Sequence, residues 1–93
     1  MKLGNRIVAV EVLSFPVVKL TYSDAFIAVM DFSEKISWGE AMLPLRNPEV
    51  FKTAHIGSGG ASLEWFGPGG EEIDFCADAL RLEAEALGTS AAE

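Results

Sequence analysis

The stretch GGASLEWFGPGGEEIDFCADALRLEAEAL, residues 59–87, decides the fold of this chain. It alternates glycine-rich turns with short runs of strand character and ends in a helical run. Residues 61–66 are predicted as a strand because Leu63 and Trp65 recur at two-residue spacing. Residues 71–75 are predicted as a second short strand that leads directly into the helix. Strands joined by tight turns and followed by one helix predict a small α+β fold.

The helix is predicted over residues 76–87, where small and apolar residues recur at helical spacing. Asp78 lies in the first turn, which the helix dipole favours, and Gly88 is a typical helix end. The residues expected to lie against the sheet are Ala77, Leu80, Ala84 and Leu87. Residues 1–88 are therefore expected to form a single domain, with 89–93 as a disordered tail.

Three strands are predicted in the N-terminal third, over residues 6–13, 17–22 and 25–32. In the first, one face carries Val8, Val10 and Val12, and the other carries Ile7, Ala9 and Glu11. In the third, the residues facing one way are Phe26, Ala28, Met30 and Phe32. Short turns between consecutive strands indicate an antiparallel meander.

The middle of the chain is predicted to hold a short helix. Residues 33–43 show no sustained period and are interpreted as a loop with a helical turn. Asn47 is a good helix cap and Pro48 suits the first helical position, so a helix of one to two turns begins there. Residues 53–56 follow as a short strand. The expected architecture is a small meander sheet, a short middle helix, further short strands, and one C-terminal helix packed on the sheet.

Composition limits the classes of function. The chain has 93 residues, of which 49% are hydrophobic, and its net charge is −7. Such a short domain has a thin core, so association with another copy is an open expectation. An acidic protein repels a phosphate backbone, which disfavours direct binding of nucleic acid. Since the chain has one cysteine, no apparent secretory signal and no long uncharged run, we expect a cytoplasmic protein that does not enter membranes.

Four segments together resemble a known bacterial family. They are YSD at 22–24, LRNPEVF at 45–51, LEW at 63–65 and IDFCADAL at 73–80. In this order they are similar to the family called domain of unknown function 2442, over roughly residues 6–84. The chain departs from the family at Ala25, where such proteins usually carry Gly, and at Ala77, where Pro often precedes the helical Asp. Both departures concern the geometry of a turn or a helix start.

The resemblance implies a small α+β fold and no activity or cofactor. It also implies a protein partner encoded by a neighbouring gene, in a pair of the toxin–antitoxin kind. Some proteins of this kind carry an added helix-turn-helix domain that binds DNA.

The lone cysteine and the lone histidine are candidates for a catalytic pair. Cys76 lies at the predicted start of the last helix, where the dipole stabilises a thiolate, so it is a candidate reactive thiol. The alternative is a small side chain packed between strand and helix. His55 lies in another strand, and no orienting third group is evident, so no catalytic residue is assigned.

Metal binding would draw on carboxylates near the last strand. The candidates are Glu71, Glu72, Asp74 and Asp78, with His55 or Cys76 as softer ligands. Carboxylates alternating along a strand do not face one point, so we expect a solvated acidic rim and no metal or other cofactor. Weak binding of a divalent cation stays open.

Large side chains in the irregular segment are candidates for contact with a partner. They are Trp38, Met42 and Leu43. The same signal would arise if this loop folded back to cover one face of the sheet. We expect a non-catalytic protein-binding module with a basic protein partner. The alternatives are a small-ligand or metal-dependent enzyme using His55, Cys76 and nearby carboxylates, and a regulatory domain whose nucleic-acid-reading module resides on a partner.

Overall fold

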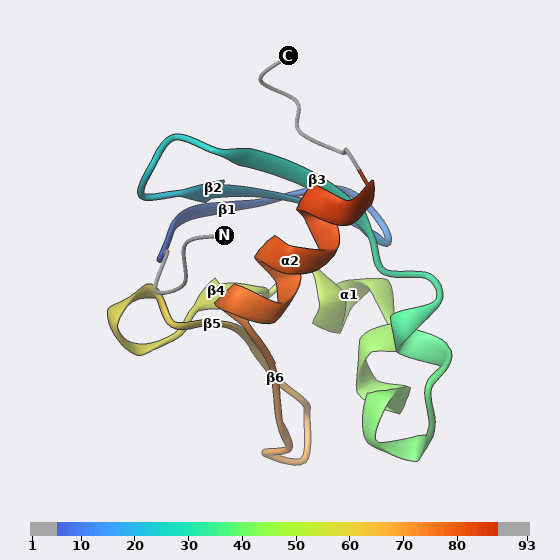
Figure 1. Ribbon diagram of the computed structural model, residues 1–93. Helices are drawn as coiled ribbons and strands as arrows, with labels where there is room; N and C mark the ends of the chain where they lie inside the picture. Colours follow the sequence, from blue (N-terminus) through green and yellow to red (C-terminus); the bar gives the residue numbers. More distant parts are fainter. Residues whose placement is uncertain (1–5, 88–93) are drawn as a thin grey trace.

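The computed structural model describes residues 6–87, which form two three-stranded antiparallel sheets with helices around them (Figure 1). The first sheet has the order β1-β2-β3, with β1 Ile7–Ser14, β2 Val17–Tyr22 and β3 Ile27–Asp31. The second has the order β4-β5-β6, with β4 His55–Ile56, β5 Ser62–Phe66 and β6 Glu72–Cys76. The α-helices are α1 Pro48–Phe51 and α2 Ala77–Leu87. The 3-10 helices are η1 Lys35–Ser37, η2 Glu40–Arg46 and η3 Ser58–Gly60. The predicted α+β class is confirmed.

An aromatic cluster joins the two sheets. Trp65 of β5 is fully buried, and its ring centroid lies 5.4 Å from that of Phe51, 5.9 Å from that of Phe32 and 5.8 Å from that of Phe75. The indole Nε1–H donates a hydrogen bond of 2.7 Å to the carbonyl of Phe51. Since Phe32 directly follows β3 and Phe51 ends α1, this cluster holds the sheets and the middle helix in one core.

The C-terminal helix packs against the first sheet and continues directly from β6 (Figure 1). Its buried side includes Ala77, Leu80 and Ala84, as the spacing predicts. The Tyr22 hydroxyl at the end of β2 donates a hydrogen bond of 2.9 Å to the Ala77 carbonyl. The predicted contact of Leu87, the helix end at Gly88 and the tail 89–93 lie outside the described residues.

The first strand differs from its prediction because it contains a bulge. The pairing with β2 shifts by one residue between Ile7 and Ala9, so Val8 is the additional residue. The shift moves Ile7 to the core side together with Val10 and Val12, and leaves Val8 56% exposed. The predicted common face of Val8, Val10 and Val12 is therefore wrong for Val8, since a bulge interrupts strict alternation.

The third strand begins at Ile27, two residues later than predicted. The two preceding positions belong to the turn that closes on Tyr22, where the Ala25 amide donates a hydrogen bond of 2.9 Å to the Tyr22 carbonyl. Ala25 has φ 74°, the only positive φ of a non-glycine residue in the described part of the chain. Glycine adopts this left-handed conformation without a steric penalty, whereas alanine does not.

The irregular segment is more helical than predicted. It forms η1 and η2 in place of one helical turn, and η2 extends to Arg46. The cap at Asn47 is as predicted, because its side-chain oxygen accepts a hydrogen bond of 2.9 Å from the Glu49 amide, with Pro48 as first helical residue. β4 covers only the second half of the strand predicted over residues 53–56.

Replacing Ala25 by Gly is expected to stabilise the protein. The left-handed conformation costs an alanine about 1–2 kcal/mol, while the added freedom of a glycine in the unfolded chain offsets about 0.4–1 kcal/mol. We expect Ala25→Gly to raise the free energy of unfolding by roughly 0.5–1 kcal/mol in urea titration. Ala79→Gly, on the exposed side of α2, is the control and should lower it by about 1 kcal/mol. A loss of stability in both variants would contradict a left-handed Ala25.

Candidate functional site

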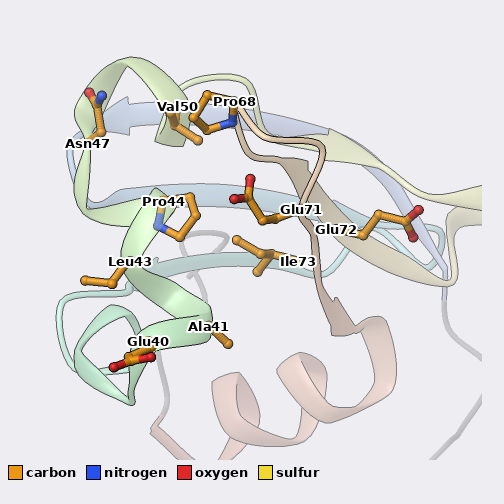
Figure 2. A pocket seen from close by; sticks show the side chains of 10 residues that line it. All are labelled: Glu40, Ala41, Leu43, Pro44, Asn47, Val50, Pro68, Glu71, Glu72 and Ile73. Atoms are coloured by element: carbon orange, nitrogen blue, oxygen red, sulfur yellow. The ribbon is translucent and has the colours of Figure 1, made fainter.

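A groove of about 530 Å³ opens between two parts of the molecule that are distant in sequence. One wall is η2 with the start of α1, and the other is the β5–β6 turn with the start of β6 (Figure 2). The lining residues are Glu40, Ala41, Leu43, Pro44, Asn47, Val50, Pro68, Glu71, Glu72 and Ile73.

Apolar side chains form most of the groove, and three glutamates also line it. Pro44 of η2 and Ile73 of β6 point toward each other across the opening (Figure 2), and Leu43 of η2 is a further apolar lining residue. The charged lining residues are Glu40, Glu71 and Glu72, and no lysine or arginine is among the lining residues. An apolar surface with an uncompensated negative rim suits a ligand that is both apolar and cationic.

Glycine at position 67 brings the β5–β6 turn close to η2. A Cβ atom there would lie 3.2 Å from the Cβ of Pro44 and would clash with the Glu71 carboxylate. The Glu71 carboxylate also accepts a hydrogen bond of 3.0 Å from the Gly69 amide. The turn therefore fixes Glu71 at the groove before any ligand arrives, which lowers the entropic cost of binding.

A second depression of about 610 Å³ lies between the β1–β2 turn and α1. It includes the exposed side chains of Leu13 and Phe15. Its charged residues neutralise each other, because Lys52 forms an ion pair of 2.7 Å with Glu49. It is larger than the groove but presents no net charge of its own, so we regard the groove as the better binding site.

The outer face of the second sheet carries the lone histidine. The register places His55 opposite Glu64, and its Nε2 lies 3.7 Å from Glu64 Oε1. The imidazole stacks on Phe66 with 5.0 Å between ring centroids. The other carboxylate oxygen of Glu64 accepts a hydrogen bond of 2.6 Å from the Ser62 hydroxyl. Sequence reasoning did not select Glu64, whose role depends on strand register.

The structure does not bring the thiol and the imidazole together. Cys76 is exposed at the end of β6 and pairs with Ser62, whereas His55 lies on the far side of β5. Two strand spacings separate β4 from β6, so the backbones of Cys76 and His55 are at least roughly 10 Å apart. A general base must lie within hydrogen-bond reach of its nucleophile. The reactive thiol stays a prediction, without a base beside it.

The acidic residues named from the sequence are spread over several elements. Glu71 and Glu72 line the groove, Asp74 is exposed on β6, and Asp78 lies in the first turn of α2. Within residues 6–87, no three histidine, cysteine or acidic side chains are placed to hold a metal ion together.

The three residues predicted as a contact surface have different environments. Leu43 lines the groove and is 48% exposed, whereas Met42 is half-buried against the core. Trp38 is exposed and does not line the groove. It lies near the buried Lys35, whose Nζ is 5.9 Å from the indole centroid. The segment therefore both covers the core, through Ile36 and Met42, and presents apolar groups outward.

The strongest electrostatic shifts lie where α2 meets the first sheet. Hydrogen bonds from the Arg81 guanidinium lower the pKa of Asp24 to about 2. Burial raises the pKa of Tyr22 to about 12. Both groups are tied to the helix by hydrogen bonds, so these shifts reflect the anchoring of α2.

No helix in the described part of the chain has the length and apolar character needed to cross a bilayer. Comparisons with models of protein families, with curated proteins and with solved structures find no match to this chain.

Proposed function

We propose that this chain is a non-catalytic protein-binding module that takes a basic, apolar segment of a partner into the groove. The observation that carries the proposal is the combination of an apolar lining with Glu40, Glu71 and Glu72 and no lining cation. Lysine or arginine side chains of the partner would face the carboxylates while apolar side chains contact Leu43, Pro44 and Ile73. The overall charge of −7 would speed association with a basic partner and disfavour acidic ones.

The biological setting of the proposal comes from sequence. The resemblance to domain of unknown function 2442 supports a bacterial pair in which the partner is encoded next to this chain. The single cysteine supports a cytoplasmic location for that pair.

Peptide titration followed by amide NMR tests the proposal. Two basic peptides are used, one alternating lysine with valine and one with lysine and leucine at helical spacing, together with acidic counterparts that carry glutamate in place of lysine. We expect at least one basic peptide to shift the amide signals of Ala41, Leu43, Val50 and Ile73, and the acidic peptides to leave them unchanged. The affinity should fall with added salt.

Two leucines provide a matched pair of variants. Leu43 and Leu82 are each 48% exposed, but only Leu43 lines the groove. Leu43→Asn is expected to weaken binding of the basic peptide by about tenfold, since burial of one leucine contributes about 1.5 kcal/mol. Leu82→Asn should leave the affinity unchanged. Equal effects of the two variants, or signal shifts confined to other surfaces, would contradict the groove as the binding site.

A further inference from the structure

The strand β6 is an edge of the second sheet and also one wall of the groove. In an antiparallel pair, the backbone groups of alternate residues point toward the partner strand and away from it. The Gly67 amide donates to the Glu71 carbonyl at 2.8 Å, and the Ala77 amide donates to the Ala61 carbonyl at 2.9 Å. These two bonds lie at the two ends of β6. They determine which alternate residues of β6 form backbone hydrogen bonds with β5.

The amide and carbonyl groups of Ile73 and Phe75 therefore point toward β5, and those of Glu72 and Asp74 point to the open edge. Outside the ladder with β5, no hydrogen bond in residues 6–87 uses the amide or carbonyl of Glu72 or Asp74. Both residues are exposed. The edge therefore offers hydrogen-bonding groups for an added strand directly beside the groove.

The directions of the β6 side chains determine which residues a strand added to this edge would need on each of its faces. Figure 2 shows Glu71 and Ile73 pointing toward η2, whereas Glu72 points the other way. Asp74 shares the outer face with Glu72, because alternate residues of a strand face the same side. A strand added to this edge would place alternate side chains beside Ile73 and the others beside the two outer carboxylates.

We propose that the partner segment binds as an additional β-strand on the open edge of β6, with alternate apolar and basic residues. The apolar residues enter the groove beside Ile73, and the lysine or arginine residues face Glu72 and Asp74 at the distance of cross-strand pairs. This inference rests on the proposed function and specifies its binding mode.

The negative charges of Glu72 and Asp74 favour a basic partner strand over a second copy of the chain at this edge. Pairing of two β6 edges would bring Glu72 and Asp74 of one copy next to the same carboxylates of the other, and like charges across strands are destabilising. Charged residues on an edge strand are a common protection against self-association. The same carboxylates attract a basic strand.

Backbone methylation of the alternating lysine–valine peptide tests the binding mode. One peptide carries N-methyl groups on the lysines and another carries them on the valines, so that each removes one set of amide donors and keeps the side chains. We expect one of the two to lose at least about tenfold in affinity and the other to change by less than about threefold. Sensitivity at the lysines indicates an antiparallel added strand, and sensitivity at the valines a parallel one. Equal effects of the two peptides would overturn strand addition.

Amide hydrogen exchange gives an independent measurement on the protein. Binding of the unmethylated peptide should slow exchange of the Glu72 and Asp74 amides by about tenfold or more. Asp74→Pro should abolish binding, because it removes an amide that β5 does not use, while Asp74→Asn keeps the amide and should weaken binding only about threefold. Unchanged exchange at both amides would overturn the proposal.

The outcomes separate the two proposals. If a basic peptide shifts the groove signals but both methylated forms bind equally, strand addition is wrong and the protein-binding groove remains. If no basic peptide binds at the groove, both are wrong. If light scattering shows that the protein alone forms a dimer and Asp74→Pro disrupts it, a second copy occupies the edge and strand addition by a basic partner is wrong.

Discussion

Trp65→Ala is expected to lower the free energy of unfolding by about 3–5 kcal/mol, the range for removing a large aromatic side chain from a core. Trp65 is fully buried and contacts the rings of Phe32, Phe51 and Phe75. Truncation also leaves the Phe51 carbonyl without its indole donor. Because small domains have total stabilities of about 5–15 kcal/mol, a large fraction of the variant should be unfolded at moderate temperature. Urea unfolding followed by far-UV circular dichroism measures the change.

The chain offers a matched control in its second tryptophan. Trp38 is 62% exposed, and its ring centroid lies 5.9 Å from Lys35 Nζ. Trp38→Ala makes the same chemical change at the surface and should cost no more than about 0.5–1 kcal/mol. Trp65→Phe should give an intermediate loss, since it keeps an aromatic ring and removes only the donor and part of the volume. Similar losses for Trp38→Ala and Trp65→Ala would contradict an aromatic cluster that joins the two sheets.

The strands could be predicted because their signals are local. Alternation of apolar residues over residues 17–22 and 61–66 depends only on which side chains face the core, and β2 and β5 formed where expected. The bulge at Val8 was not predicted, because the alternation of valines in β1 continues through it without a break. The left-handed backbone conformation of Ala25 was not predicted, because the apolar alternation indicated a strand beginning at residue 25.

The groove could not be predicted because its walls are assembled by tertiary packing. Leu43 was selected for a break in periodicity, and Glu71 as a candidate metal ligand, without any signal that they line the same groove. The close packing of Gly67 on Pro44 depends on the path of the chain between them. The same holds for the open edge of β6, since the split into two sheets decides which strands are edges.

Arg81→Ala is expected to release α2 from the first sheet and to cost about 2 kcal/mol from lost stacking and packing alone. The guanidinium carbon lies 3.9 Å from the centroid of Phe26 and 5.2 Å from that of Tyr22. Its nitrogens donate to Asp24 at 2.8 and 3.0 Å and to Glu85 at 2.5 Å. Both carboxylates are more than a third exposed, so they can be hydrated again when the arginine is removed.

The pH dependence of the stability lost in Arg81→Ala shows how much of it comes from the ion pair between Asp24 and Arg81. The pKa of Asp24 is about 2 in the folded protein, against 3.8 ordinarily, because Arg81 donates hydrogen bonds to its carboxylate. A lowered pKa in the folded state adds stability above pH 3.8, and this contribution is lost as the pH falls through about 2. The difference in stability between the unmodified protein and Arg81→Ala should therefore be constant near neutral pH and shrink between about pH 4 and pH 2, measured by urea unfolding across this range.

Lys52→Ala, which removes the exposed pair with Glu49, is the control and should change stability by less than about 0.5 kcal/mol at every pH. A loss in Arg81→Ala that stays constant down to pH 2 would mean that stacking on Phe26 accounts for all of it, and that the Asp24 ion pair does not hold the helix to the sheet.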